Sequence, residues 1–321
     1  MEHKLYPLRF EPILKEKIWG GQKLNSTYNK GDDSQAKVGE SWEIADLKEG
    51  QSIIKNGELS GKTLKQIIDQ NPEGLLGKKV YERFGKQFPL LIKFIDAAKD
   101  LSIQVHPSDE TSPTGVGKTE MWFIMQADEG AKITVGFKPN MSRDKFSEHI
   151  ESNTVEEAMD LHEVHHGDSF FINAGRIHAI GGGVVLAEIQ QTSDVTYRVY
   201  DYNRKDDNGE LRELHIEESK DVLDYKDTKD FKLNYSKVEN EVQTLKHHDY
   251  FKTDWLQLKN DEYTLSNRDS FTILMVVSGS LQYSADDSDM TLSAGQTLLI
   301  PAEYSEFNVK AKDCELLEIY L

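Results

Sequence analysis

Short runs of alternating apolar and polar residues dominate this 321-residue chain. Runs rich in Val, Ile, Phe and Tyr, punctuated by Gly, Asn and Asp, fill three regions, about 89–140, 167–204 and 245–321. Alternation with a period of two residues between turn-forming residues is typical of β-strands in barrels or sandwiches. The pattern therefore predicts a mainly β protein with jelly-roll barrels.

Two regions change to the helical period. Thr63 and Ser142 each stand before apolar residues spaced by three or four positions, as an N-cap residue stands before an amphipathic helix. In the second region the period continues as a further turn through Val155, Ala158, Met159 and Leu161. We expect small helical insertions beside the barrel, near 60–86 and 141–162.

One predicted strand carries its polar groups on a single face. Ser102, Gln104 and His106 alternate with apolar residues, so an extended chain turns all three the same way. Glu120 and His178 follow in later strands. Imidazole and carboxylate ligands without thiolates suit zinc, manganese, iron or nickel. The sequence predicts a metal site of Gln104, His106, Glu120 and His178 inside a barrel, with a further coordination position open rather than a closed structural zinc site.

A spacing in the first barrel returns near the end of the chain. Gly295-x5-Pro301 repeats the spacing of Gly167-x5-Asn173, and Glu306 then stands where the first copy has His178. We expect two barrels of one type: a metal-bearing catalytic domain over 1–235, and a structural C-terminal barrel without metal ligands over 236–321.

The composition limits the classes of partner that this protein can bind. The 56 acidic and 38 basic residues give a net charge of −18, which opposes binding to nucleic acid and to anionic lipid. The single cysteine, Cys314, excludes an internal disulfide. The chain has no signal-peptide pattern and no run approaching the roughly 20 apolar residues of a membrane span. We expect a cytoplasmic protein, either a monomer or a weak homo-oligomer.

Cations in predicted strands point to an anionic small molecule. Lys93 interrupts an apolar run, where burial is costly unless the ammonium meets an anion. Lys118 and Arg198 fall on polar strand faces as well. Together these three residues would form the cationic pocket that a phosphate ester needs in so acidic a protein.

Several segments of the chain, in order and spacing, resemble the type I mannose-6-phosphate isomerases in their short bacterial form, which are zinc enzymes of the cupin superfamily. The similarity covers about residues 5–204. The segments are Ile18-Trp19-Gly20-Gly21, Gly39-Glu40-Ser41-Trp42-Glu43, LSIQVHPSD, Lys118-x-Glu120-x-Trp122, Ala174-Gly175-Arg176-Ile177-His178-Ala179, and Glu188 through Ser193-Asp194 to Arg198.

The resemblance implies one zinc ion per chain, bound by Gln104, His106, Glu120 and His178. It also implies a sugar-phosphate cavity, with Ser102 contacting the phosphate and other residues forming the lining. Those residues are Trp19, Lys93, Lys118, Glu188, Asp194 and Arg198. The implied reaction interconverts mannose 6-phosphate and fructose 6-phosphate.

This reaction moves a proton between C1 and C2 through an enediol or enediolate. Lys118 or Glu188 would carry the proton: Lys118 needs neighbouring cations to favour its neutral form, and Glu188 is a weak base unless desolvated. Arg198 would stabilise the enediolate or the phosphate. Two alternatives stay open, a metal-dependent cupin dioxygenase and a sugar-phosphate sensor without catalysis.

Overall fold

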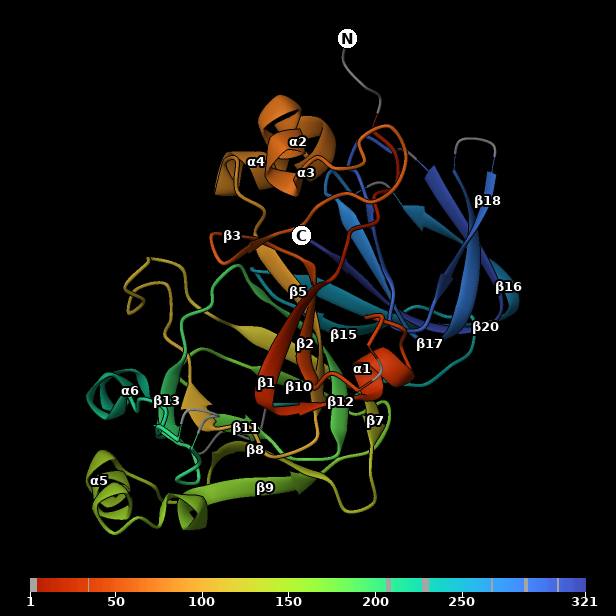
Figure 1. Ribbon diagram of the computed structural model, residues 1–321. Coiled ribbons are helices and arrows are strands. Elements are labelled where there is room, and N and C mark those ends of the chain that lie inside the picture. The colour runs from red at the N-terminus through yellow and green to blue at the C-terminus, as the bar shows by residue number, and fades with distance from the viewer. Residues whose placement is uncertain are drawn as a thin grey trace.

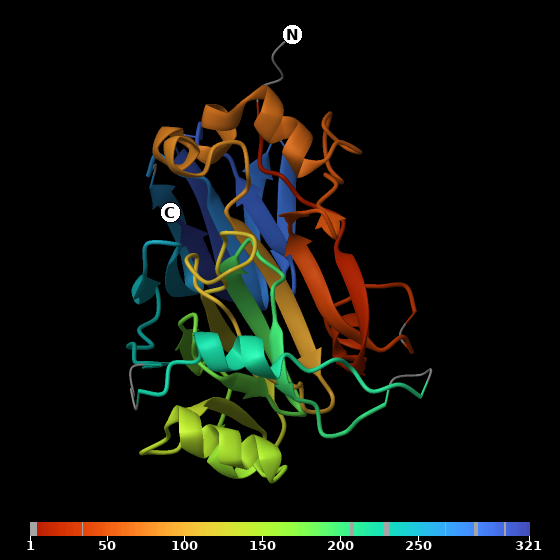
Figure 2. The same ribbon diagram turned by 90° about the vertical axis from the view of Figure 1, so that its left-hand side faces the viewer.

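The computed structural model describes residues 5–33, 35–205, 209–226, 231–266, 268–285, 288–304 and 306–321. Figures 1 and 2 show two β-rich regions joined side by side, with short helices at the two ends of the molecule. No helix among the described residues is long and apolar enough to cross a membrane.

The first region pairs a seven-stranded sheet with a five-stranded sheet. The larger sheet has the order β1 (Ile13–Gly21), β2 (Val38–Ile44), β5 (Leu90–Ala97), β12 (Val184–Gln191), β7 (Glu120–Ala127), β10 (Ser169–Ile172) and β14 (Lys232–Leu233). The smaller has the order β13 (Tyr197–Tyr200), β6 (Ile103–Val105), β11 (His178–Ile180), β8 (Lys132–Phe137) and β9 (Met159–Glu163). A separate ribbon pairs β3 (Asp46–Leu47) with β4 (Gly50–Gln51). The named pairings in these sheets are antiparallel, as a jelly roll requires.

The second region is one six-stranded sheet that bends strongly on itself. It contains β15 (Gln243–His247), β16 (Lys252–Ser266), β20 (Glu306–Tyr320), β17 (Thr272–Ala285), β18 (Ser288–Ser293) and β19 (Thr297–Ile300). Its interior is apolar and includes Leu256, Leu274, Leu298 and Leu316, all buried. The mainly β fold with cupin-type architecture is therefore confirmed.

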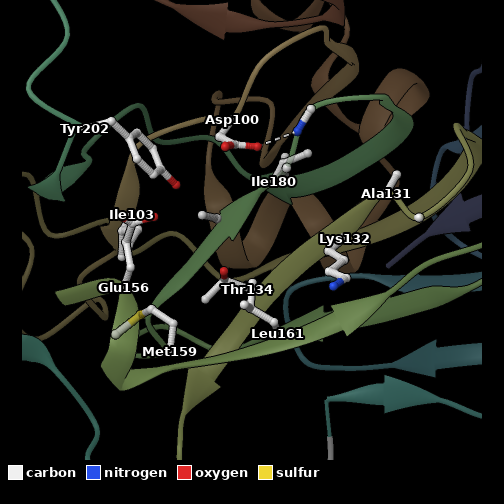
Figure 3. Close-up of a pocket in the computed structure, with 14 residues that line it drawn as sticks. Asp100, Ile103, Ala131, Lys132, Thr134, Glu156, Met159, Leu161, Ile180 and Tyr202 are labelled. Atoms are coloured by element: carbon white, nitrogen blue, oxygen red, sulfur yellow. Dashed lines mark hydrogen bonds between the residues drawn. The ribbon is translucent and has the colours of Figure 1, made fainter. Parts of the chain in front are cut away.

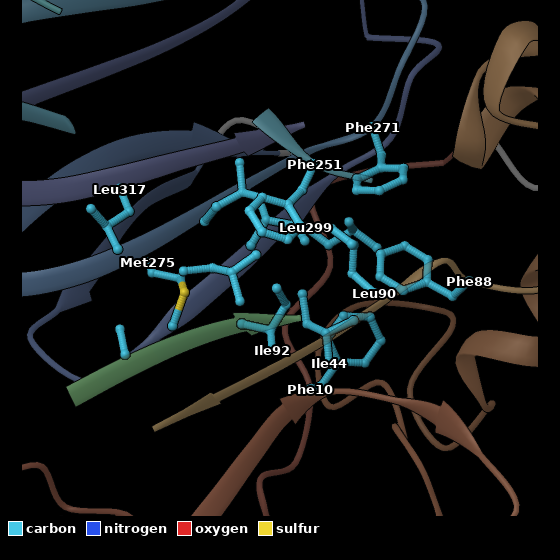
Figure 4. Packing of buried hydrophobic residues seen from close by; sticks show 14 of the residues in the cluster. Phe10, Ile44, Phe88, Leu90, Ile92, Phe251, Phe271, Met275, Leu299 and Leu317 are labelled. Carbon is cyan, nitrogen blue, oxygen red and sulfur yellow. The ribbon is translucent and has the colours of Figure 1, made fainter. Parts of the chain in front are cut away.

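A single hydrophobic cluster joins the two regions. Figure 4 shows Phe88, Leu90 and Ile92 of the first region packed against Phe271 and Met275 of the second. The rings of Phe88 and Phe271 stand 4.7 Å apart, centroid to centroid. Burying these large apolar side chains is the main force that holds the regions together.

Both predicted helical insertions are present, and the structure adds two short helices that the sequence did not predict. Near 60–86 the helices are α2 (Leu64–Gln70), α3 (Pro72–Leu76) and α4 (Lys78–Phe84), and near 141–162 they are α5 (Arg143–Glu151) and a 3-10 turn (Val155–Ala158); the two additional helices are α1 (Lys23–Ser26) and α6 (Ile216–Val222). Thr63 accepts a hydrogen bond from Gln66 N in a capping box, and Ser142 accepts one from Lys145 N. Both N-cap predictions are confirmed.

The predicted helical turn through Met159 and Leu161 is wrong. These residues begin β9, which pairs with β8: Leu161 lies opposite Thr134 and Met159 opposite Phe137. Met159 is buried where β9 begins, and Leu161, two residues further along the strand, is exposed. The free edge of the five-stranded sheet accepts this segment, and strand pairing overrides the weak helical period.

Candidate active site

Adjacent strands of the smaller sheet bring three polar side chains together. Gln104 lies on β6, which pairs with β11 on one side and β13 on the other. Its cross-strand neighbours are His178 on β11 and Arg198 on β13. The Gln104 side-chain amide lies 3.3 Å from His178 Nε2. His106 follows directly after β6, and Glu120 begins β7 of the larger sheet. The two sheets therefore contribute to one cluster.

Both histidines present the same ring nitrogen to this cluster. His106 Nδ1 lies 3.0 Å from Val195 O, and His178 Nδ1 lies 2.9 Å from Arg176 O. A carbonyl oxygen can only accept, so each Nδ1 carries the proton and each Nε2 keeps its lone pair. Burial lowers the pKa of His106 well below its ordinary value and that of His178 to about 4, so both imidazoles are neutral near pH 7.

Glu120 faces these two lone pairs with a buried carboxylate, and the Lys118 ammonium lies 3.4 Å from one of its oxygens, Oε2. Both oxygens are buried and have no hydrogen-bond partner among the described residues. Oε1 lies 3.4 Å from His178 Nε2, and Oε2 lies 3.6 Å from His106 Nε2. Burial, with a contribution from Glu188, raises the pKa of Glu120 to about 8. A buried carboxylate with a raised pKa beside two neutral imidazoles is an arrangement that a bound cation would stabilise.

The ligand atoms of these three residues lie within 4.8 Å of one another. His106, Glu120 and His178 therefore fit a divalent metal ion by donor type, protonation and convergence. Gln104 borders the cluster through its amide, whose oxygen is the atom that would bind a metal.

A cavity of about 260 Å³ opens beside the cluster. Every predicted substrate or proton-transfer residue contributes to its lining, together with the predicted metal ligand Gln104. The residues are Trp19, Lys93, Ser102, Gln104, Lys118, Glu188, Asp194 and Arg198. Side chains from five strands and three connecting segments therefore converge on one space.

Lys93 and Glu188 form a buried ion pair at one wall. Their strands are neighbours, and Lys93 Nζ lies 3.0 Å from Glu188 Oε1. Trp122 Nε1 donates to the second oxygen, Oε2, at 3.0 Å. Burial opposes the charge on both groups, but the pKa of Lys93 is raised by Glu188, and the pKa of Glu188 is lowered chiefly by Lys93. Both groups are therefore charged at neutral pH.

Lys118 lies between the cavity and the cluster of His106, Glu120 and His178. Its ammonium is 3.0 Å from His106 Nε2 and 3.4 Å from Glu120 Oε2, and the residue is 4% exposed. It precedes β7, so the connecting segment before the strand, rather than the strand itself, sets its position.

Three charged lining residues were not among the predicted site residues: Lys17, Glu40 and Arg212. Glu40 lies 3.2 Å from Lys17 and 4.0 Å from Lys93, and these cations lower its pKa to about 2 despite burial. Strand alternation could have found Glu40, which lies two residues before Trp42. Arg212 gives no such signal, because it lies in an irregular segment that only tertiary structure brings to the cavity.

A second cavity, of about 320 Å³, lies on the outer face of the five-stranded sheet. Figure 3 shows Asp100, Tyr202, Met159 and Ile103 around it. Ile103 immediately precedes Gln104, so the strand period turns these neighbours to opposite faces. This cavity is therefore separated from the metal cluster by the sheet.

Comparison with known proteins gives the family. The model for the type I phosphomannose isomerase catalytic domain matches residues 8–154, and the mannose-6-phosphate isomerase cupin domain matches 240–321. Mannose-6-phosphate isomerase ManA of Bacillus subtilis is 33% identical over 309 residues, covering 95% of this chain and 96% of that protein. The chain belongs to the type I mannose-6-phosphate isomerases.

Other members of this family agree. The Streptococcus mutans mannose-6-phosphate isomerase is 39% identical over 220 residues, covering 68% of this chain and 67% of that protein. The crystal structure of the mannose 6-phosphate isomerase from Bacillus subtilis superimposes with a TM-score of 0.88 at 30% identity, over 99% of this chain and 100% of that one. Membership in this family favours an isomerase over the dioxygenase and sensor alternatives.

Proposed function

We propose that this cavity interconverts mannose 6-phosphate and fructose 6-phosphate with one zinc ion per chain, held by Gln104, His106, Glu120 and His178. The observation that carries the proposal is the buried Glu120 carboxylate, which has no hydrogen-bond partner among the described residues and faces the Nε2 lone pairs of two neutral histidines. The Lys118 ammonium lies 3.4 Å from one of its oxygens, Oε2. Zinc accepts imidazole and carboxylate ligands. When bound, it would supply Lewis-acid polarisation of the sugar oxygens at C1 and C2.

The proton moves between C1 and C2 through an enediol or enediolate, and the structure favours Lys118 over Glu188 as the group that carries it. Glu188 is engaged by Lys93 and Trp122, and its lowered pKa makes it a weak base. Lys118 is next to two of the metal ligands and lines the cavity. Glu188 instead holds Lys93 at the cavity wall.

The phosphate group of the substrate would be bound by cationic residues that line the cavity. Arg198 donates from Nη1 to Glu213 O, which fixes its guanidinium while Nε stays buried without a partner among the described residues. Ser102 and Arg212 line the same space. A phosphate dianion would give Arg198 Nε an acceptor.

Metal removal tests the reaction and the cofactor together. A coupled assay that converts mannose 6-phosphate to fructose 6-phosphate should show turnover that a chelator abolishes and zinc restores. Turnover that persists in the metal-free protein, verified by elemental analysis, would contradict the proposal.

Solvent-deuterium exchange at C2 of the sugar tests the proton carrier. Lys118→Met should lose exchange, whereas Glu188→Gln should retain it at a reduced rate. Retained exchange in Lys118→Met would remove Lys118 from the role.

A further inference from the structure

A chain of hydrogen bonds runs from the second region of the molecule to the metal cluster. It begins at Tyr250, in the connection between β15 and β16, whose hydroxyl donates to Asp109 Oδ2 at 2.6 Å. Tyr250 lies within the cupin domain of residues 240–321, and Asp109 lies within the catalytic domain of residues 8–154. This contact joins the two domains directly at the segment between β6 and β7.

Asp109 organises that segment through its other oxygen. Oδ1 accepts from Gly117 N at 2.7 Å and from Gln191 Nε2 at 2.9 Å. The backbone folds tightly here: a Cβ at Gly117 would stand 2.7 Å from Asp109 N, so the segment closes on itself at Gly117. The segment is bracketed by His106 on one side and by Lys118 and Glu120 on the other.

Gln191 connects Asp109 to the segment that carries Lys118 and Glu120. Its side-chain Oε1 accepts from Thr119 N at 2.9 Å, and its own backbone N donates to Thr119 O at 3.2 Å. Thr119 stands between Lys118 and Glu120, so both polar groups of its backbone are fixed by one glutamine. The orientation of that glutamine amide is fixed in turn by Asp109.

Tyr250 is itself well held. Its ring packs 5.3 Å from the ring of His248, and the Arg83 guanidinium of α4 lies 5.8 Å from its centroid. Arg83 also donates to Asp249 O at 2.6 Å. Burial and the bond to Asp109 raise the pKa of Tyr250 to about 12, so the hydroxyl keeps its proton throughout the working pH range.

We propose that Tyr250 is a positioning residue for the isomerase site, which acts through Asp109 and Gln191 to fix Lys118 and Glu120. The second domain then contributes to catalysis as well as to stability. This inference rests on the proposed roles of Glu120 as metal ligand and Lys118 as proton carrier.

Tyr250→Phe tests the proposal because it removes the hydroxyl and keeps the ring. Groups that orient metal ligands cost about 10–100-fold in metal affinity or activity when lost, and Tyr250 acts at one further step, so we expect a loss of about 3–10-fold in kcat. KM should change less than about twofold, because the residues proposed to bind the phosphate are untouched. Zinc affinity, measured by competition with a chromophoric chelator, should fall in parallel.

The matched control is Tyr263→Phe, which removes a hydroxyl bonded to Glu318 at 2.9 Å within the second barrel. It should leave kcat and zinc affinity unchanged. Asp109→Asn alters the same hydrogen bond from the catalytic-domain side. In the double variant, Tyr250→Phe should therefore cause little further loss beyond that of Asp109→Asn.

The outcomes separate the claims. Tyr250→Phe with a lowered unfolding midpoint but wild-type kcat and zinc affinity would overturn the positioning role. If Tyr250→Phe does not fold, Asp109→Asn decides by the same two readouts. If the wild type binds zinc without isomerising the sugar, the proposed function fails, and the zinc affinities still decide whether Tyr250 positions the cluster.

Discussion

The two β-regions share a local plan and differ in what fills them. Gly167 and Gly295, both with positive φ, each precede a strand that begins two residues later, β10 in one region and β19 in the other. Eleven residues after each glycine another strand begins, at His178 in the first region and at Glu306 in the second. His178 is buried in the metal cluster, whereas Glu306 is exposed.

The interiors differ in the same way. The interior of the second barrel is mainly aliphatic and aromatic, and its buried Glu318 is paired with Arg268, while the first barrel buries Lys93, Glu120, Lys118 and Glu188 around a cavity. Burying charges is costly unless they are paired, so the first barrel gives up packing stability for chemistry. One fold thus serves two purposes, and the residues facing inward decide which.

The equivalent positions of His178 and Glu306 allow the largest test of this difference. His178→Ala should lower kcat more than about a hundredfold, since losing even a group that only orients a metal ligand reaches that magnitude. Zinc bound per chain, measured by elemental analysis after gel filtration, should fall with it. Glu306→Ala, at the matching exposed position, should leave both unchanged, and an equal loss in both variants would contradict the contrast.

Removing one partner of the buried pair tests the cost of the polar interior. Lys93→Met leaves the Glu188 carboxylate buried and unpaired, so the free energy of unfolding should fall by about 3–5 kcal/mol. Lys93→Met with Glu188→Gln should recover much of this stability while activity stays low. Urea unfolding of the four proteins in the cycle measures both effects. A double variant no more stable than Lys93→Met would show that the pair does not carry the cost.

The smallest expected effect is on the pH dependence of stability, and it comes from a contact between the two regions. His166, beside Gly167, lies 2.8 Å from Glu315 of β20, and this hydrogen bond raises the pKa of the imidazole above its ordinary value of about 6.5. The bond therefore stabilises the folded protein fully below about pH 6.5, and its contribution is lost as the pH rises through the raised pKa.

Urea unfolding between pH 6 and pH 9 checks this sign. The stability difference between wild type and Glu315→Gln should be largest at pH 6 and should shrink toward pH 9. His166→Gln serves as the matched control, because it should remove the same pH dependence. A difference that grows with pH would reverse the assignment.

Much of the fold and of the candidate site could be predicted from the sequence, because the strand period and the helix period are both visible in it. Strand alternation placed Ser102 and Gln104 on one face, and the N-caps Thr63 and Ser142 marked two helices. The resemblance supplied the set that the cavity brings together. Alternation could not find Arg212, which lines the cavity, or Tyr250, which bonds to Asp109, because both lie in irregular segments placed by tertiary contacts. The error at Met159 arose because a helical period cannot foresee a partner strand.

Anomalous diffraction at the zinc absorption edge, from a crystal of the zinc-loaded protein, tests the central claim most directly. The account predicts one strong peak per chain, bonded to Gln104, His106, Glu120 and His178. A peak bonded to other residues, or fully active crystals with no peak at this position, would contradict it.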